Sequence, residues 1–439
     1  MRTSEVAAAT GGRLVGPDVT VAGAAIDSRL VRGGELFVAV VAERDGHDFA
    51  GAALAAGAGA VLTSRPASEV VPGPGATAVE VADTMTALAA LGAHARDRLD
   101  AGAGARVVGV TGSVGKTSVK DLLGGALATR WRTVASAGSF NNELGVPLTL
   151  LAADDGTEAA VVEMGARGPG HVAALCAMAR PSVGVVTRVA AVHTETFGSI
   201  DGVAAAKGEL VAALPAGGTA VLNAGDPRVA AMAARTEAEV LSFGEGGAVR
   251  AEEVRLDAEL RPVFRLATPW GGAEVRLAAR GRHMVENALA AAAAALACAV
   301  PLDGVADALA TGTVSHWRME LTTLGSGARI LNDAYNANPT SMAAALRALA
   351  ALDAERRVAV LGVMAELGPT SETDHRAVGD LARELGIEVV AVGVPAYGGM
   401  LVPDVAGAVA ALRSLGPGDA VLLKGSRVAG LERVAASLT

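Results

Sequence analysis

Val107-Val-Gly-Val-Thr-Gly-Ser-Val-Gly-Lys-Thr-Ser118 is an apolar run that leads into a glycine-rich turn and then into a helix-forming segment. Glycines let backbone N–H groups wrap phosphate oxygens, and the start of the helix adds a favourable dipole. In such a loop Lys116 reaches the β- and γ-phosphates and Thr117 offers its hydroxyl to magnesium. The usual spacing has glycine at position 110, where this chain has Val110, so the loop is the shorter Gly-x-x-Gly-Lys-Thr form. The residues expected around a bound nucleotide are Thr111, Gly112, Ser113, Val114, Gly115, Lys116 and Thr117.

A second apolar run, Ala159-Ala-Val-Val-Glu-Met-Gly165, places a carboxylate where a strand is expected to end. Magnesium prefers oxygen ligands, and a carboxylate beside a phosphate loop can hold the ion directly or through water. Glu163 is therefore the expected magnesium-binding acid.

The rest of the chain alternates short β-branched runs with helical segments, which favours parallel strands buried on both faces. Its 439 residues are enough for two or three domains. We expect an α/β protein with three domains: a small mixed α/β N-terminal domain at 1–83, a central P-loop parallel-sheet ATPase domain at 84–312, and a C-terminal Rossmann-like domain at 313–439. The strands expected in the first domain are 20–25, 36–41, 60–63 and 76–81, and alternating residues predict antiparallel strands within 250–278.

The overall composition excludes several classes of protein. A net charge of −9 and a pI near 5.4 argue against a general binder of nucleic acids or anionic membranes. Cys176 and Cys298 are too few for a disulfide framework or a zinc site. The longest apolar run, 288–300, is shorter than the roughly 20 residues that span a bilayer, and the N-terminus has no signal-peptide pattern. We expect a cytoplasmic protein that is not membrane-embedded and binds no nucleic acid.

Lysine is rare, because only Lys116, Lys120, Lys207 and Lys424 occur among 37 basic residues. Arginine can supply surface charge, whereas the compact ammonium of lysine suits phosphate contact and its amine can be modified covalently. The bias predicts that some of the retained lysines have such a role. Lys207 follows a strand that carries His193, and Lys424 lies in a Lys-Gly-Ser-Arg turn.

Together these stretches resemble the Mur ligase family, the ATP-dependent amide-forming enzymes of peptidoglycan synthesis, over essentially the whole chain. The family's phosphate loop is matched by 111–118, and its substrate-side loop by Phe140-Asn-Asn-Glu-Leu-Gly-Val-Pro-Leu-Thr149. Its histidine followed by Phe-Gly falls on His193, and its carbamylated lysine falls on Lys207. The resemblance implies that Lys116, Glu163, His193 and Lys207 are catalytic and that Thr117, Glu163, His193 and Lys207 surround magnesium.

The resemblance also implies a modified lysine and a nucleotide site. A carbamate on Lys207 would replace a cation by an anionic oxygen ligand that could help position a second magnesium ion, which arginine cannot do. For the nucleotide, the residues carried over from the family are His283, Asn287, Arg318 and Asp333. Met284 stands where the family's Gly-x-His-Asn motif has asparagine, and Ala42, Arg188 and Val363 also differ from the usual residues.

Three stretches of the third domain indicate the substrates. The stretches 332–342, 361–369 and 423–427 resemble those of family members that attach D-alanyl-D-alanine to UDP-N-acetylmuramoyl-tripeptide, and 27–29 and 37–49 resemble their uridine-nucleotide domain. The implied substrate residues are Ser28, Arg29, Asn141, Asn142, Tyr335, Asn336, Asn338, Lys424, Ser426 and Arg427. The implied protein is a monomer that uses ATP and Mg²⁺; the third residue of the tripeptide, diaminopimelate or lysine, stays open.

The implied reaction transfers the γ-phosphoryl group of ATP to the tripeptide carboxylate, and the amine of D-alanyl-D-alanine then attacks the acyl phosphate. One alternative is the ligase that adds a diamino acid to the dipeptide precursor, although its Asp-Asn-Pro-Arg motif is absent and Tyr335-Asn-Ala-Asn-Pro339 stands instead. Another is a non-catalytic nucleotide-binding homologue, supported by Arg188, Met284 and Val363 alone. A small-molecule P-loop kinase would leave the first and third domains without a role.

Overall fold

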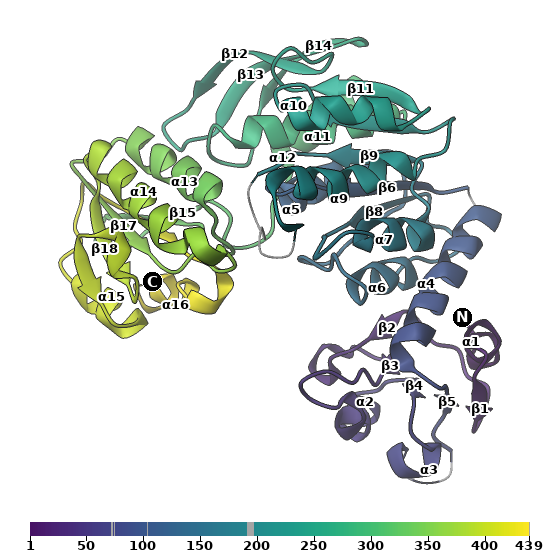
Figure 1. The fold of residues 1–439 in the computed structure, drawn as a ribbon. Coiled ribbons are helices and arrows are strands. Elements are labelled where there is room, and N and C mark those ends of the chain that lie inside the picture. Colours follow the sequence, from purple (N-terminus) through teal and green to yellow (C-terminus); the bar gives the residue numbers. More distant parts are fainter. Residues whose placement is uncertain (72, 74, 103, 191–196, 439) are drawn as a thin grey trace.

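The computed structural model describes residues 1–439 except 72, 74, 103, 191–196 and 439. Three α/β modules follow one another along the chain, coloured purple, blue to teal, and green to yellow (Figure 1). The predicted α/β fold class is confirmed. Each sheet lies within one of the three predicted segments.

The N-terminal module contains a five-stranded mixed sheet in the order β1-β5-β4-β3-β2. The elements are α1 (Thr3–Thr10), β1 (Arg13–Val15), β2 (Ala24–Ala25), β3 (Leu36–Val38), α2 (Ala50–Ala55), β4 (Ala60–Thr63), α3 (Ala67–Val70) and β5 (Ala78–Glu80). β1 is antiparallel to β5, and the other neighbours are parallel. The strand expected at 20–25 is shorter in the structure, because Gly23 has a φ of 78° and interrupts the extended backbone before β2.

Helix α4 (Thr84–Ala101) connects the first two modules. Asp83 caps the helix, since its side chain accepts a hydrogen bond from Thr86 N at 2.6 Å. The buried side of α4 includes Leu88, Leu91 and Leu99, which belong to one hydrophobic cluster with residues of both modules. The helix packs against α1 of the first module and against α6 (Gly145–Leu151) and α7 (His171–Ala179) of the second. The two modules therefore share a hydrophobic core.

The central module contains a six-stranded, all-parallel sheet in the order β11-β10-β9-β6-β8-β7. Its strands are β6 (Arg106–Thr111), β7 (Thr133–Ala135), β8 (Ala159–Glu163), β9 (Val183–Val186), β10 (Thr219–Asn223) and β11 (Glu239–Phe243). Its further helices are α5 (Lys116–Ala128), α9 (Ile200–Ala212), α10 (Pro227–Ala230), α11 (Met284–Ala297) and α12 (Leu302–Thr311). The antiparallel strands expected within 250–278 are present as β12 (Arg250–Leu256), β13 (Pro262–Thr268) and β14 (Gly271–Arg276).

Helix α11 lies at the centre of this module and packs against α5. Its alanines from Ala290 to Ala295 are all fully buried. Alanine has the highest helix propensity and a small side chain, so the helix forms readily and its neighbours can approach closely. This packing fixes the first turn of α11 beside the phosphate loop.

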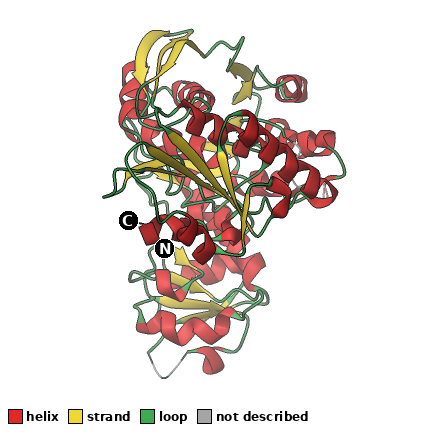
Figure 2. Cartoon of the chain, turned by 90° about the vertical axis from the view of Figure 1, so that its left-hand side faces the viewer, coloured by secondary structure: helices red, strands yellow, loops and turns green. Residues whose placement is uncertain are grey.

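The C-terminal module contains a six-stranded sheet in the order β15-β16-β20-β17-β18-β19, in which only the pairing of β15 with β16 is antiparallel. The strands are β15 (Glu320–Thr323), β16 (Arg329–Asn332), β17 (Arg356–Leu361), β18 (Glu388–Val392), β19 (Met400–Val402) and β20 (Asp419–Lys424). The helices are α13 (Pro339–Ala351), α14 (Ser371–Glu384), α15 (Val405–Ala411) and α16 (Glu432–Leu438). Figure 2 shows the strands set among the helices that cover them.

Candidate active site

A cavity of about 1010 Å³ lies where the central module meets the C-terminal module. The phosphate loop, the end of β8 and helix α9 contribute to it from the central module, and the loops that follow β16 and β20 contribute from the C-terminal module. The sequence-predicted residues that line it are Gly112, Ser113, Val114, Gly115, Lys116, Thr117, Asn141, Asn142, Glu163, Lys207, His283, Asn287, Arg318, Asp333, Tyr335, Asn336, Asn338, Lys424, Ser426 and Arg427. Thr111 is buried beneath the loop, where its hydroxyl donates to Met164 O at 2.7 Å. His193 lies outside the described residues.

The phosphate loop has a backbone that only glycine adopts without strain at two positions. Gly112 has a φ of 144°, and a Cβ there would lie 1.9 Å from Thr187 Oγ1. Gly115 has a φ of 89° at the start of α5, and a Cβ there would lie 2.4 Å from Asn287 Oδ1. Both glycines therefore allow close backbone approach as well as a left-handed turn. The N-terminus of α5 is left facing the cavity, where it favours an anion.

Lys116 lies across the mouth of this loop. Its Nζ donates a hydrogen bond to Gly112 O at 2.8 Å. Burial lowers the pKa of Lys116, Glu163 opposes this shift, and the nearby charge of Arg318 adds to it. A phosphate-loop lysine, a carboxylate at the end of β8 and an arginine of the C-terminal module thus lie close enough to influence one another in the same cavity. Such a group of charges suits a polyphosphate with a bound metal.

Glu163 provides the test of whether magnesium fits this site. Its side chain is buried, and Oε1 accepts a hydrogen bond from Asn141 Nδ2 at 2.8 Å. Its Oε2 is buried and has no hydrogen-bond partner among the described residues. A buried carboxylate oxygen without a partner is costly unless a ligand satisfies it. A magnesium ion held by Glu163 and the Thr117 hydroxyl would do so.

The described part of the chain holds no cluster of three or more histidine, cysteine, aspartate or glutamate side chains with metal-binding geometry. Magnesium in nucleotide sites is commonly held by one or two carboxylates together with phosphate oxygens and water. The residues present therefore fit a magnesium ion that arrives with a nucleotide.

Lys207 lies on α9, faces the same cavity, and is 3% exposed. Burial lowers the pKa of Lys207 to about 7, with a further lowering by Lys116 and an opposing effect of Glu209. A substantial fraction of this amine is therefore uncharged at neutral pH. The uncharged form is the one that can act as a nucleophile.

The nucleotide flank contains an ion pair that connects β9 to α11. The guanidinium of Arg188 donates to both carboxylate oxygens of Glu286, and Asn223 Nδ2 donates to the same carboxylate at 2.8 Å. Met284 is buried, and its sulfur accepts a hydrogen bond from Asn287 Nδ2 at 3.3 Å. Two residues that depart from the family pattern thus have defined partners beside the loop.

His283 also lies on this flank. Burial lowers its pKa, Asp333 opposes the shift, and Lys424 adds to it. The charges of Asp333 and Lys424 in the C-terminal module thus act on His283, which directly precedes α11 on the opposite side of the cavity.

Lys424 donates its hydrogen bonds to residues of the C-terminal module. It is 2% exposed, and its Nζ donates to Asp333 Oδ2 at 2.5 Å, to Asn336 O at 2.9 Å and to Asp333 O at 3.3 Å. An ammonium has three donors, so this geometry fixes the loop after β16. A direct contact between Lys424 and substrate remains a prediction.

The neighbouring predicted residues also shape loops. Ser426 Oγ accepts from Ala365 N at 2.9 Å, and the Asn338 side chain caps α13 by accepting from Ser341 N at 2.9 Å. Arg427 places its guanidinium 4.2 Å from the centroid of the Trp317 ring. Ser426, Asn338 and Arg427 line the cavity as well as making these contacts.

Ser139 is a site residue that the sequence reasoning missed. Its hydroxyl accepts a hydrogen bond from Tyr335 OH at 2.5 Å and lies 3.3 Å from Thr117 Oγ1. The available signal was its position directly before the substrate-side loop that begins at Phe140. Ser139 therefore joins the phosphate loop to the C-terminal module.

Three family models match the chain: the Mur ligase middle domain over residues 110–295, the Mur ligase, glutamate ligase domain over 317–427, and the Mur ligase family, catalytic domain over 20–96. The chain belongs to the Mur ligase family. Among relatives of this family, the UDP-N-acetylmuramoyl-tripeptide–D-alanyl-D-alanine ligase of Mycobacterium bovis is 43% identical, over 94% of this chain and 91% of the relative. The enzyme of the same name from Escherichia coli is 37% identical, over 97% and 96%.

Solved structures of Mur ligases agree with this membership. MurF from Acinetobacter baumannii superposes with a TM-score of 0.86 at 32% identity, covering 99% of this chain and 98% of that one. The MurF ligase from Thermotoga maritima, in complex with ADP, superposes with a TM-score of 0.80 at 29% identity, covering 95% and 96%.

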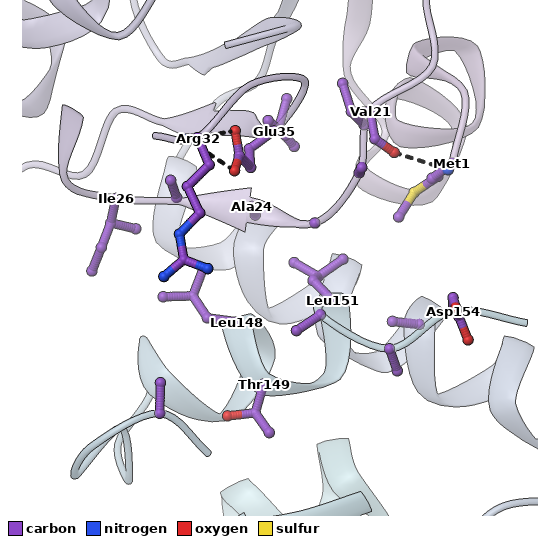
Figure 3. Close-up of a pocket in the computed structure, with 18 of the residues that line it drawn as sticks. Met1, Val21, Ala24, Ile26, Arg32, Glu35, Leu148, Thr149, Leu151 and Asp154 are labelled. Carbon is purple, nitrogen blue, oxygen red and sulfur yellow. Dashed lines mark hydrogen bonds between the residues drawn. The ribbon is translucent and has the colours of Figure 1, made fainter. Parts of the chain in front are cut away.

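The Mur ligase chain also has a second cavity, of about 710 Å³, between its N-terminal and central modules. Figure 3 shows Ala24 and Ile26 of the N-terminal module opposite Leu148 and Leu151 of α6, with the side chain of Arg32 extending toward Leu148. This seam is mainly apolar.

No described helix is both long enough and apolar enough to cross a membrane.

Ser28 and Arg29 lie in a short 3-10 helix (Ser28–Leu30) at the edge of this seam. The Arg29 side chain is 85% exposed and pairs with Asp27 at 2.6 Å. Hydrogen bonds from Arg29 lower the pKa of Asp27 to about 2. Ser28 and Arg29 line neither of the two cavities. Their contact with a uridine nucleotide remains a prediction.

Proposed function

We propose that this Mur ligase joins the amine of D-alanyl-D-alanine to the terminal carboxylate of UDP-N-acetylmuramoyl-tripeptide, with ATP converted to ADP and phosphate. The observation that carries the proposal is the shared cavity, in which the phosphate loop and Glu163 face Arg318, Asn336 and Asn338 of the C-terminal module. The relatives at 43% and 37% identity, which are named for this reaction, support it.

The proposed chemistry relies on positioning and charge neutralisation. Lys116 and the N-terminus of α5 hold the phosphates of ATP while the tripeptide carboxylate attacks the γ-phosphorus, and ADP leaves. A magnesium ion, held by Thr117 and Glu163, would supply further neutralisation of phosphate charge. The amine of the dipeptide then attacks the carbonyl carbon of the acyl phosphate, and the tetrahedral adduct expels phosphate. Arg318 provides positive charge from the C-terminal side.

We also propose that Lys207 carries a carbamate. The support is its burial in the cavity and its pKa of about 7, since an uncharged amine can attack CO₂ and release a proton to form the carbamate. The modified side chain would then offer an anionic oxygen where an ammonium would repel Lys116. Lys207→Ala is expected to reduce ligation severely and to regain part of it when small carboxylic acids are added. Near-normal activity of the unsupplemented variant would disprove the carbamate role.

The decisive experiment supplies ATP, Mg²⁺, UDP-N-acetylmuramoyl-tripeptide and D-alanyl-D-alanine, and measures product mass and phosphate release. The expected product is heavier than the tripeptide substrate by D-alanyl-D-alanine less one water. A product formed instead from the dipeptide precursor and diaminopimelate would indicate the neighbouring ligase. Nucleotide binding without substrate-dependent phosphate release would indicate a non-catalytic homologue. Tripeptides ending in diaminopimelate or lysine, compared side by side, determine the preferred third residue.

We propose a cytoplasmic monomer, because the reaction uses ATP and a UDP-linked precursor, and because one chain supplies both the phosphate loop and the C-terminal loops that line the shared cavity. Sedimentation analysis with and without substrates tests the monomer.

A further inference from the structure

Three hydroxyl groups form a continuous line across the boundary between the central and C-terminal modules. Thr117 belongs to the phosphate loop, Ser139 follows β7, and Tyr335 lies in the loop after β16. Tyr335 OH donates to Ser139 Oγ at 2.5 Å, and Ser139 Oγ lies 3.3 Å from Thr117 Oγ1. The line therefore reaches from the predicted dipeptide loop to the predicted magnesium ligand.

The Tyr335 end and the Ser139 middle of the line are held in place by other contacts. The ring of Tyr335 lies 4.4 Å from the guanidinium carbon of Arg318, which fixes its direction by a cation–π contact. The segment around Ser139 is anchored by Lys120, whose Nζ donates to Ser136 O at 2.8 Å and to Gly138 O at 3.1 Å. The Ser139 hydroxyl thus has a defined position between the two modules.

The same segment supports the predicted metal acid. Asn141, two residues after Ser139, donates from its side chain to Glu163 Oε1 at 2.8 Å and accepts from Gly165 N at 2.6 Å through its carbonyl. Ser139 and Asn141 consequently contact Thr117 and Glu163, two of the residues that are expected to hold magnesium. A displacement of this segment would disturb Thr117 and Glu163 together.

The direction of the hydroxyl protons gives the line a function. A hydroxyl that binds a metal offers a lone pair to the ion and must point its proton elsewhere. For Thr117 the available acceptor is Ser139 Oγ. Because Ser139 Oγ also accepts a hydrogen bond from Tyr335 OH, the C-terminal module fixes the position of the Ser139 hydroxyl. Partners of a metal ligand that lie outside the metal's own coordination shell commonly change metal affinity by 10–100-fold.

We propose that Ser139 and Tyr335 are positioning residues that couple the seating of the C-terminal module to magnesium binding at Thr117. The inference rests on the proposed use of ATP and magnesium. Without the hydrogen bonds of Ser139 and Tyr335 the phosphate loop can still bind nucleotide, but the hydroxyl of Thr117 is free to rotate. The enzyme therefore binds magnesium tightly only when the module that carries the dipeptide loop is in place.

The test compares Ser139→Ala, Tyr335→Phe and the double variant with the wild type. Tyr335→Phe keeps the ring above which Arg318 lies and removes only the hydroxyl. Tyr397→Phe is a matched control, because Tyr397 is the other tyrosine of the chain and its hydroxyl donates to Gly362 O at 2.8 Å in the same module, away from the cavity. Thermal unfolding without ligands checks that all variants fold.

The first readout is the affinity for ADP at a series of Mg²⁺ concentrations, measured by calorimetry. The second is the Mg²⁺ concentration for half-maximal phosphate release, compared with kcat. Each single variant is expected to raise the Mg²⁺ requirement at least about fivefold, the factor that corresponds to the loss of one hydrogen bond of ordinary net strength. Because the two residues act through one line, the double variant should show about the same change as either single variant. Tyr397→Phe should leave the Mg²⁺ requirement unchanged.

A wild-type Mg²⁺ requirement in Tyr335→Phe, or multiplication of the two single effects in the double variant, would overturn the coupling. If the wild type binds Mg²⁺ and ADP but does not ligate, the proposed function fails, and the calorimetric comparison still decides the coupling. If the wild type ligates but binds ADP with no dependence on Mg²⁺, the coupling is wrong and the proposed function stands.

Discussion

The guanidinium of Arg188 donates hydrogen bonds of 3.0 and 2.6 Å to the two carboxylate oxygens of Glu286, which lies 98 residues later in the chain. The pair joins the residues after β9 to the first turn of α11, on either side of the phosphate loop. Arg188 differs from the residue that is usual in the family, yet it has a planar, two-point partner of the kind that arginine favours. The departure is therefore accommodated by a specific contact.

Arg188→Asn is expected to lower the free energy of unfolding by about 1 kcal/mol or less, because the two side chains are 40% and 33% exposed and water replaces much of the lost pairing. Urea denaturation measures the change. Arg250→Asn, which removes a similarly exposed pair on β12, is the control. A loss several times larger than in the control would mean that the pair behaves as a buried one.

Lys424→Met is expected to destabilise the protein by about 3 kcal/mol, since it leaves the carboxylate of Asp333, whose side chain is only 14% exposed, without its cation. Adding Asp333→Asn to this variant should recover part of the loss, because the unpaired charge is then removed. Guanidinium denaturation, followed by fluorescence and by circular dichroism, provides the comparison. Equal stability of Lys424→Met and wild type would contradict the structural role of this lysine.

Gly115→Ala is expected to abolish most nucleotide binding and to lower stability, because φ is 89° and the new Cβ would lie 2.4 Å from Asn287 Oδ1. Gly125→Ala, on the same helix, is the matched control. No described atom lies within 4 Å of the Cβ position at Gly125, so alanine should stabilise the helix by up to about 1 kcal/mol. Thermal unfolding temperatures of the two variants should therefore shift in opposite directions, and only Gly115→Ala should lose ADP binding.

Glu163→Gln is expected to reduce ligation by at least about 100-fold, because the metal loses its anionic protein ligand. Its free energy of unfolding should be unchanged or higher, since a buried carboxylate oxygen without a described partner is costly in the unliganded protein. Glu239→Gln, at an exposed position of β11, should leave both quantities unaltered. A strongly destabilised Glu163→Gln protein would assign this residue a structural role instead.

The lowered pKa of Lys207 gives a pH dependence with a definite sign. Its ordinary pKa of 10.5 applies to the unfolded chain, and its folded value is about 7. Between these two values the unfolded chain binds more protons, so the contribution of Lys207 to stability rises with pH from about 7 to 10.5. In CO₂-free buffer, the difference in stability between wild type and Lys207→Met should shift in favour of the wild type over this range. A difference that is constant with pH would mean that Lys207 titrates normally in the folded protein.

The local elements of the site could be predicted from sequence because each is contained in a short stretch. The strand ending in Glu163 has the bounds expected from its apolar run, and β4 coincides with the run at 60–63. The phosphate loop was recognisable from its glycines and from the helix that follows. Within such segments, local backbone preference and burial on both faces of the sheet agree.

The partners across the site could not be predicted in the same way. Lys424 meets Asp333 because β20 pairs with β16, although 91 residues separate the two side chains along the chain. Tyr335 meets Ser139 across 196 residues and a module boundary. The assignment of Lys424 and Tyr335 to substrate stays a prediction, and their protein partners, which follow from strand order and module packing, were not foreseen. Such pairings depend on tertiary arrangement, which periodicity and composition do not contain.

The shared core around α4 has a consequence for substrate length. Because Leu88, Leu91 and Leu99 join the first two modules in one hydrophobic cluster, the first module is held at a set distance from the phosphate loop. A precursor whose nucleotide end rests on the first module must then bridge that fixed gap with its sugar and peptide stem. The fixed separation would then select for the length of the peptide stem, because a stem one residue too short could not bring its carboxylate to the γ-phosphate.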